Sequence, residues 1–274
     1  MIVLHILAWI FIVVLIVTVN QFTLAIYDAL NARTKPFEGA VAVAVEVLQE
    51  TVFMFLSVLT YVLGFINYDA LFLKKGPSSH PPVLLVHGYM MNRACFLYVH
   101  VRLALAGYRV FTVNLYPPAL SITELSDRVA DKMDEIAEKT GEKQVYLVGH
   151  SMGGLVSRYY ANSARGDGRI KGLITIASPH RGTKIAVLGI GKNAREMVPG
   201  SDFLSALNST PLPPVFALWS TLDNLIIPAG NGFMDGMENE AVPLKGHMAL
   251  LYSGAVYRRV VARLSSPAQH GAAG

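Results

Sequence analysis

Residues 145–160 read VYLVGHSMGGLVSRYY. The apolar run at 144–148 predicts a buried central strand, and 152–163 has the pattern of a helix. Between them, residues 149–153 (Gly-His-Ser-Met-Gly) fit the pattern G-x-S-x-G. A strand that turns at once into a helix is the setting of a nucleophile elbow, which lifts the serine to the carboxyl end of a sheet. We expect both glycines to be required, because a side chain at either position would collide with the neighbouring strand or helix.

Strands and helices alternate on both sides of this motif. Short apolar or β-branched runs predict strands at 83–86, 109–115, 172–177 and 215–219, and helical patterns lie at 92–106 and 121–139. Ser121 and Glu124 give the later helix a capping-box start, and Gly141 follows its end. Such alternation predicts an α/β fold, with a mostly parallel sheet that carries helices on both faces.

A serine in such a turn needs two partners before it can act as a nucleophile. A histidine must accept its proton, and a carboxylate must orient that histidine. With this elbow the chain order is serine, acid, histidine. Of the histidines after Ser151, His270 lies in a small-residue tail, and His180 follows the elbow closely with only Asp167 in between. His247 is therefore the predicted base.

The orienting acid must lie between Ser151 and His247. Asp223 directly follows the predicted strand at 215–219, in a strand-end loop at the sheet edge where this carboxylate is needed. Its alternative interpretation is a turn or helix-cap aspartate. The remaining acids in the interval are Asp167, Glu196, Asp202, Asp235, Glu238 and Glu240. We predict Asp223, because Asp202 falls in an insertion and the last three stand close before a later strand.

The oxyanion of an acyl-transfer reaction needs two backbone N–H donors. Met152 follows the nucleophile and supplies one, and the loop at 87–90 supplies the other, with Tyr89 as the predicted donor. We interpret His87 and His150 as structural histidines. The sequence has no Cys/His metal cluster, phosphate-binding glycine loop or dinucleotide fingerprint, so we expect no cofactor and no metal.

The first part of the chain differs in composition from the rest. Hydrophobic residues make up 53% of the chain and charged residues 15%, and the apolar excess lies in this first part. Residues 2–19 are apolar except for His5 and Thr18, and as a helix they would cross a hydrocarbon core of roughly 30 Å. A cleaved signal peptide would have a basic start and a shorter apolar core, whereas the first basic residue is Arg33. We expect a retained membrane anchor.

A second apolar stretch at 37–66 contains Glu46 and Glu50, one helical turn apart. It could span the membrane, lie in the interface as an amphipathic helix, or pack on the catalytic domain and deliver substrate. A buried polar pair inside a bundle is one interpretation of the two glutamates. We expect instead that they occupy a solvated helix face.

The chain divides into four expected regions. They are membrane-anchoring helices at 1–73, a linker rich in Pro, Gly and Ser at 74–82, a catalytic domain at 83–264 and a flexible tail at 265–274. Arg33 and Lys35 favour a cytoplasmic loop between the apolar stretches. With two spans the domain would then be periplasmic, although Lys74 and Lys75 weaken this orientation.

These motifs together resemble the bacterial lipase and esterase branch of the α/β-hydrolases, over residues 83–251. The motifs are VHGY (86–89), the elbow segment, IASPHRGT (176–183), MVPGSDFLSALN (197–208), WSTLDNLIIP (219–228) and GHMALLYS (246–253). The resemblance implies an α/β-hydrolase fold and supports Asp223 and His247 as partners of Ser151. It also implies a lid at 184–207, for which an ordinary core helix is the alternative. A calcium site of the family cannot be carried over, because its ligands have no match here.

We therefore expect a serine hydrolase of lipid acyl esters, associated with a membrane that we take to be the bacterial inner membrane. Some secreted relatives have a cleavable signal or a disulfide, whereas the single cysteine here, Cys95, can form none within the chain and suggests an inert buried thiol. The alternatives are a phospholipase A, an acyl-thioesterase or acyltransferase with the same triad, and a catalytically silent fold that binds a lipid or a partner. The net charge of +4 is too small to indicate nucleic acid, and the sequence leaves the oligomeric state open.

Overall fold

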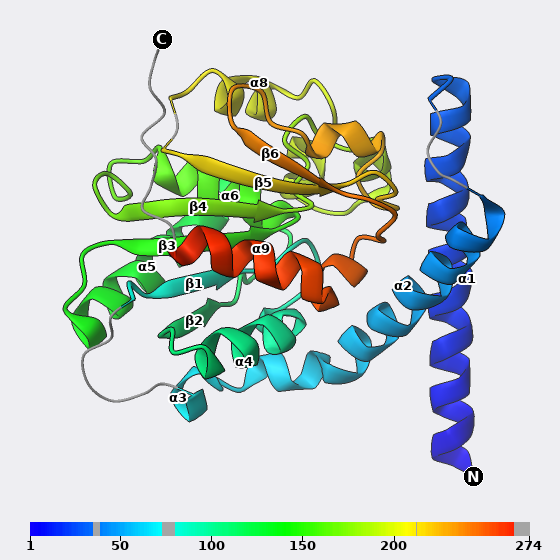
Figure 1. Cartoon of the computed structure of the whole chain (residues 1–274), viewed down its shortest axis with the longest axis horizontal. Helices are drawn as coiled ribbons and strands as arrows, with labels where there is room; N and C mark the ends of the chain where they lie inside the picture. Colours follow the sequence, from blue (N-terminus) through cyan, green and yellow to red (C-terminus); the bar gives the residue numbers. More distant parts are fainter. Residues whose placement is uncertain (35–38, 73–79, 212, 266–274) are drawn as a thin grey trace.

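The computed structural model describes residues 1–34, 39–72, 80–211 and 213–265 (Figure 1). Its centre is a parallel sheet of six strands in the order β2-β1-β3-β4-β5-β6. The strands are β1 (Val83–Val86), β2 (Val110–Val113), β3 (Val145–His150), β4 (Ile170–Ile176), β5 (Val215–Ser220) and β6 (Glu238–Val242). The predicted parallel sheet is confirmed, with β3 at its middle. Because all neighbours run parallel, the carboxyl ends of the strands meet at one edge.

Helices follow the strands in alternation, as predicted. The α-helices are α1 (Ile2–Asn31), α2 (Ala40–Thr60), α3 (Asp69–Phe72), α4 (Leu97–Leu105), α5 (Ile122–Thr140), α6 (Met152–Ala161), α7 (Lys192–Glu196), α8 (Asp202–Asn208) and α9 (Gly254–Ser265). Short 3₁₀ helices are η1 (Tyr61–Phe65), η2 (Arg93–Phe96), η3 (Lys184–Leu188), η4 (Ala229–Gly232) and η5 (Ala249–Tyr252). The predicted helix at 92–106 thus consists of η2 followed by α4. The capping box of α5 is confirmed, since Ser121 and Glu124 each bond the backbone of the other.

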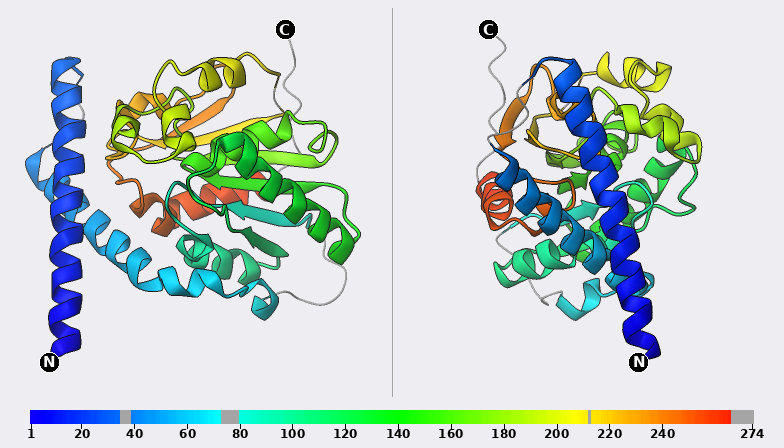
Figure 2. Two further views of the ribbon diagram at one scale, coloured as in Figure 1. Left: turned by 180° about the vertical axis from the view of Figure 1, so that it is seen from behind. Right: turned by 90° about the vertical axis from the view of Figure 1, so that its right-hand side faces the viewer.

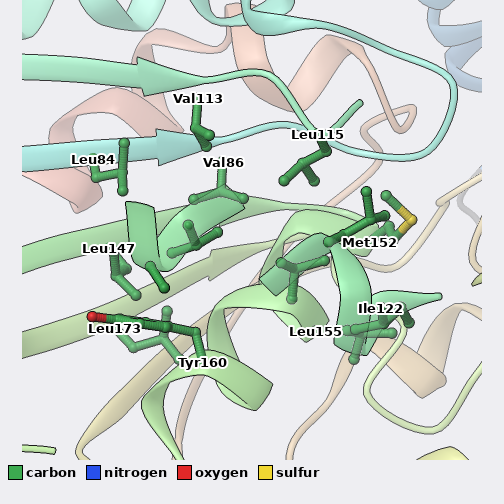
Figure 3. Packing of buried hydrophobic residues seen from close by; sticks show 14 of the residues in the cluster. Leu84, Val86, Val113, Leu115, Ile122, Leu147, Met152, Leu155, Tyr160 and Leu173 are labelled. Carbon is green, nitrogen blue, oxygen red and sulfur yellow. The ribbon is translucent and has the colours of Figure 1, made fainter. Parts of the chain in front are cut away.

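The sheet is buried on both faces. Leu84 and Val86 of β1 point into one apolar cluster with α5 and α6, which Figure 3 shows in detail. Val83 and Leu85 point into the opposite cluster, which α4 and α9 complete. This alternation follows from the two-residue period of a strand, and it explains why β1 is apolar at every position.

Strand β6 lies at one edge of the sheet and was not predicted with its observed limits. Glu238 and Glu240, which we placed before a later strand, lie within β6 itself. They form ion pairs with Arg263 and Arg259 of α9. An edge strand tolerates such charges because one of its sides is open to solvent, so the apolar pattern that marks the central strands is missing here.

The first two helices form a hairpin beside the domain. Figures 1 and 2 show α1 as a long helix next to the carboxyl edge of the sheet, with α2 crossing it and continuing towards α4. Where the helices cross, Phe11 and Phe55 meet edge to face with ring centroids 5.3 Å apart. Helix α1 extends well beyond the predicted apolar segment at 2–19, and both helices are long and apolar enough to cross a membrane.

Helix α2 is the reverse of an ordinary surface helix. Its buried residues are polar, whereas Val41, Leu48 and other large apolar side chains of the helix are exposed. The predicted solvated face for Glu46 and Glu50 is wrong, because these side chains are only 5% and 0% exposed. They pack against the domain, where backbone N–H groups and a lysine satisfy them. Spacing in the sequence placed both acids on one side of the helix but could not reveal what covers that side.

The segment that joins the hairpin to β1 also packs into the domain. Asp69 of α3 is buried, and its carboxylate accepts hydrogen bonds from the backbone N–H and the hydroxyl of Thr112 at 3.0 and 2.6 Å. Lys132 of α5 lies 3.4 Å from the same carboxylate. Within residues 1–73, predicted as membrane-anchoring, Asp69 thus helps to hold β2. Most of the predicted linker and all but the first residue of the predicted tail lie outside the described residues.

Candidate active site

Ser151 stands on a strained turn between β3 and α6. Its backbone has φ 55° and ψ −129°, and its N–H donates to the carbonyl of Ile176 at 2.9 Å. A Cβ added at Gly153 would lie 2.1 Å from the carbonyl oxygen of Val86, and one at Gly149 would lie 2.6 Å from the backbone of Gly154. The steric reason predicted for both glycines is therefore confirmed. Helix α6 can approach β1 and β3 this closely only without those side chains.

Ser151 and His247 open into the same pocket of about 470 Å³ at the carboxyl edge of the sheet. The α/β domain supplies an apolar lining that includes Met91, Ile226 and Met248. The N-terminal helices supply the rest of the wall, α1 through Val17, Asn20, Gln21 and Leu24 and α2 through Met54. These helix residues were not predicted as pocket residues from the sequence. The polar pair Asn20–Gln21, directly after an apolar run, is the signal that could have indicated them.

Asp223 and His247 meet as predicted. Nδ1 of His247 lies 3.0 Å from each carboxylate oxygen of Asp223. The backbone N–H groups of Leu225 and Ile226 donate to Asp223 Oδ1, both at 2.8 Å, and fix the carboxylate in its loop. Asn224 contributes next to it, because its Oδ1 accepts the backbone N–H of His247 at 2.8 Å. Asp223 thus orients the ring of His247, and Asn224 holds the backbone of the same residue.

The environment of His247 favours its protonated form. Burial by itself lowers the pKa of this imidazole, but the charge and hydrogen bond of Asp223, with a smaller effect of Glu50, outweigh burial and raise the pKa above its usual value. Among the described residues, Ser151 Oγ makes no hydrogen bond to His247. Catalytic hydrogen bonds often tighten only when substrate binds.

The two predicted oxyanion donors come from the elbow and from the turn after β1. Met152 begins α6, and Tyr89 lies in the turn after β1, where Gly88 passes close to Ser151. Neither N–H donates to another described residue, so both are free to bind a ligand. The phenol of Tyr89 is anchored elsewhere, because its oxygen accepts from Ile190 N–H at 2.7 Å and donates to Ile190 carbonyl at 2.8 Å.

His87 and His150 are buried close to the predicted triad. His87 accepts from the N–H of Leu115 and donates to the carbonyl of Gly88, both at 2.9 Å, and burial lowers its pKa to about 4. His150 is buried beside His247, with ring centroids 4.6 Å apart. Burial also lowers its pKa well below the usual range, which keeps it neutral. His87 is a hydrogen-bonded loop histidine, as predicted. His150 also lines the pocket, and its predicted packing role stays a prediction.

The residues rejected in the sequence analysis lie away from this arrangement. His180 is buried between Arg158 and Thr175, whose side chains lie 3.1 and 2.9 Å from its ring nitrogens. Asp235 pairs with Arg181. Glu196 accepts a hydrogen bond from the N–H of Ile122. His270 lies outside the described residues. Cys95 is buried, as expected, and burial raises its pKa far above the usual range.

The segment at 184–207, for which a lid and a core helix were the two interpretations, is partly exposed and partly buried. Ala194, Met197 and Leu204 belong to the apolar core, whereas Val187, Leu188 and Ile190 are between 67% and 73% exposed. Ile185 and Leu188 line the pocket. An ion pair between Lys184 and Asp28 links the start of this segment to α1. Its first half is therefore an exposed apolar rim, and its second half is core.

No group of three or more His, Cys, Asp or Glu side chains is arranged for a metal ion in the described ranges.

A family model described as the alpha/beta hydrolase fold matches residues 81–200. The crystal structure of Aspergillus fumigatus lipase B superimposes with a TM-score of 0.63 at 17% identity, over 72% of this chain and 55% of that one. The mature form of a Bacillus licheniformis lipase gives 0.62 at 16% identity, over 70% of this chain and 95% of that one. The chain has the α/β-hydrolase fold. The chain combines this fold with an N-terminal helical hairpin, and its elbow lies inside the matched segment.

Part of the chain is also similar in sequence to bacterial lipases. Triacylglycerol lipases of Pseudarthrobacter phenanthrenivorans and Burkholderia plantarii are each 31% identical to the chain over 117 residues, which is 40% of its length. The match covers 36% and 32% of those proteins, so the chain aligns with about a third of the length of each. The predicted resemblance to bacterial lipases and esterases is confirmed.

We predict that Gly153→Ala destabilises the protein by about 1–3 kcal/mol, because the added methyl overpacks the contact between α6 and β1. Urea unfolding of detergent-solubilised protein measures the change. Gly230→Ala is the matched control, since its Cβ would meet no atom within 4 Å. Equal stability of both variants would contradict the steric requirement at the elbow.

Proposed function

We propose that this protein is a membrane-associated serine hydrolase that cleaves the carboxylic esters of lipids. Ser151 is the nucleophile, His247 the general base and Asp223 the orienting acid. The observation that carries the proposal is the shared apolar pocket of Ser151 and His247, with Asp223 bonded to the far nitrogen of the imidazole. The similarity to bacterial lipases supports the same reaction class.

In the first half of the reaction, Nε2 of His247 accepts the proton of the Ser151 hydroxyl as the oxygen attacks the ester carbonyl. The resulting imidazolium is stabilised by the carboxylate of Asp223. The N–H groups of Tyr89 and Met152 bind the oxyanion, and the positive end of α6 points at the same place. Collapse of this tetrahedral intermediate breaks the ester bond, and the imidazolium gives its proton to the leaving alcohol.

In the second half, His247 accepts a proton from water, and the hydroxide attacks the acyl group held on Ser151. The new tetrahedral intermediate uses the same two N–H donors. Its collapse releases the carboxylic acid and returns the proton to Ser151. Every proton therefore passes through one imidazole nitrogen, which requires the other nitrogen to stay bonded to Asp223.

Lipid substrates are supported by what surrounds the pocket. Its lining is mainly apolar, and one wall is helix α1, whose Val17 and Leu24 face the cavity. Val187, Leu188 and Ile190 add an exposed apolar rim beside it. A lipid chain leaving a bilayer along α1 would meet Val17 and Leu24 in the wall of the pocket that holds Ser151.

Membrane association is supported by the apolar surface of the hairpin. Helix α1 exposes a nearly continuous set of large apolar residues: Ile2, Val3, Leu4, Ile6, Trp9, Ile12, Val13, Ile16, Val17 and Val19. Helix α2 turns its polar residues towards the domain and its apolar residues outward. Apolar patches of this extent are unusual on soluble proteins and mark membrane or partner surfaces. We assign this surface to the hydrocarbon region of a bilayer.

Replacing the nucleophile tests the proposed chemistry most directly. Ser151→Ala should lower kcat for a p-nitrophenyl acyl ester by at least about 10⁴-fold, because no acyl-enzyme can form. Wild-type protein should also show a burst of p-nitrophenol equal to the enzyme concentration when deacylation is slow. Turnover by Ser151→Ala at the wild-type rate would exclude the mechanism.

The activity should depend on pH through His247. Its pKa is raised, so the protonated, inactive form persists to higher pH, and kcat/KM should fall as pH drops through that raised pKa. Asp223→Asn removes the main raising influence and should move this acidic limb to lower pH, while kcat falls about 10⁴-fold. A pH–rate profile of both proteins measures the shift. An unmoved limb would argue against Asp223 as the orienting acid.

The apolar hairpin should keep the protein in membranes without detergent. We expect the full chain to remain in the membrane pellet after washing with high salt and with alkaline carbonate, and to be released by detergent. Immunoblotting of pellet and supernatant checks the partition. Release by carbonate alone would contradict the placement of the hairpin in the hydrocarbon region.

A further inference from the structure

The backbone around His247 is held by helix α2 as well as by the hydrolase domain. The N–H groups of Met248 and Ala249, the two residues after His247, donate to the two carboxylate oxygens of Glu50, each at 2.8 Å. On the other side, Lys245 pairs with Glu46 and donates to Gln49 Oε1 at 2.9 Å. Three side chains from one face of α2 therefore contact the segment that carries the histidine.

Glu50 is fully buried at this contact. A Cβ at Gly246 would lie 2.5 Å from Glu50 Oε2, so the carboxylate occupies the space that a side chain there would take. Burying a carboxylate is costly unless hydrogen bonds satisfy it. Both oxygens of Glu50 are satisfied by N–H groups adjacent to His247, and the acid does not line the pocket. Glu50 therefore contacts the backbone next to His247 and not the pocket in which we place the substrate.

Helix α1 supports the same residue through a second path. Gln21 Oε1 accepts a hydrogen bond from Asn224 Nδ2 at 2.8 Å. Asn224 in turn accepts the backbone N–H of His247, also at 2.8 Å. The backbone of His247 is thus fixed from α1 on one side, and the N–H groups that follow it are fixed from α2 on the other.

We propose that Glu50 is a positioning residue for His247, so that docking of helix α2 onto the domain completes the active site. This inference rests on the proposed function of His247 as the general base. Glu50 acts by holding the backbone after His247, and in its ionised form it also helps to raise the pKa of the imidazole. The groups that face His247 are then Asp223 from the loop after β5, Glu50 from α2 and His150 from the end of β3.

With Glu50 in this role, the hairpin would contribute to catalysis as well as to membrane attachment. A hydrolase domain whose α2 is undocked would lose the acceptor for two backbone N–H groups and the charge that assists Asp223. Activity would then depend on the position of helices that we place in the bilayer. A simple anchor, in contrast, would leave turnover of a soluble ester unaffected.

The test compares Glu50→Gln with wild type, as full-length protein in detergent micelles, with a short-chain p-nitrophenyl ester. Glutamine keeps one acceptor oxygen, removes the charge and directs an NH₂ group at the second N–H. We expect kcat to fall roughly 10- to 100-fold, because small displacements of a catalytic group are costly, with KM within about threefold. The acidic limb of kcat/KM should also move to lower pH, since Glu50 helps to raise the pKa of His247.

Two variants of α2 serve as controls. Glu46→Gln removes a charge one turn earlier on the same face, where the carboxylate contacts Lys245 and the N–H of Gly246, and should leave the acidic limb in place. Ser57→Ala removes a buried hydrogen bond of 3.2 Å to Tyr252 and tests docking away from His247. It should leave kcat and the pH profile unchanged. Thermal unfolding measures the folded fraction of each variant, to which all rates are normalised.

The outcomes separate this inference from the proposed function. Wild-type kcat and an unmoved limb in folded Glu50→Gln would overturn the positioning role, and so would an equal shift of the limb in Glu46→Gln. A loss of rate that only follows the loss of folded protein would also overturn it. An inactive wild type, or an active Ser151→Ala, would instead contradict the proposed function itself.

Discussion

The close approach of helix α6 to strand β1 is the constraint on which the site depends. At Gly153 the helix backbone lies so near the carbonyl of Val86 that no side chain fits between them. This contact forces the turn at Ser151 into a positive φ, a conformation that costs energy in any residue with a Cβ. The surrounding sheet can hold such a turn because β3 is its central strand and is paired on both sides. The serine is thereby presented at the edge of the sheet.

The parallel sheet then determines what can meet the serine. Gly149 pairs with Val86 on one side and with Thr175 on the other, so the loops after β1, β3 and β4 leave the sheet at the same level. The loop after β5 brings Asp223 to that edge, and the segment after β6 brings His247. Groups far apart along the chain gather here because parallel strands end together.

The hairpin makes specific polar contacts with the α/β domain. In α2, polar side chains face the domain and apolar side chains face outward, which is the arrangement expected where the surroundings are less polar than the protein contact. In such surroundings, buried hydrogen bonds and charges hold a helix in a specific register. Glu46 and Glu50 supply those interactions at the segment that carries His247. The hairpin that we propose as a membrane anchor therefore also forms part of the pocket wall and supports the histidine.

The sequence by itself determined the elbow, the parallel sheet and the pairing of Asp223 with His247, because each depends on local pattern or on chain order. Apolar runs defined the central strands, since a strand buried on both faces must be apolar at nearly every position. The limits of strand β6 could not be predicted from the sequence, because edge strands carry charges and lack the continuous apolar run. Only the tertiary structure decided that Asn20 and Gln21 line the pocket and that Glu50 contacts the residues after His247. Helical spacing places residues on a face of α1 or α2, but packing between segments about 200 residues apart decides what that face meets.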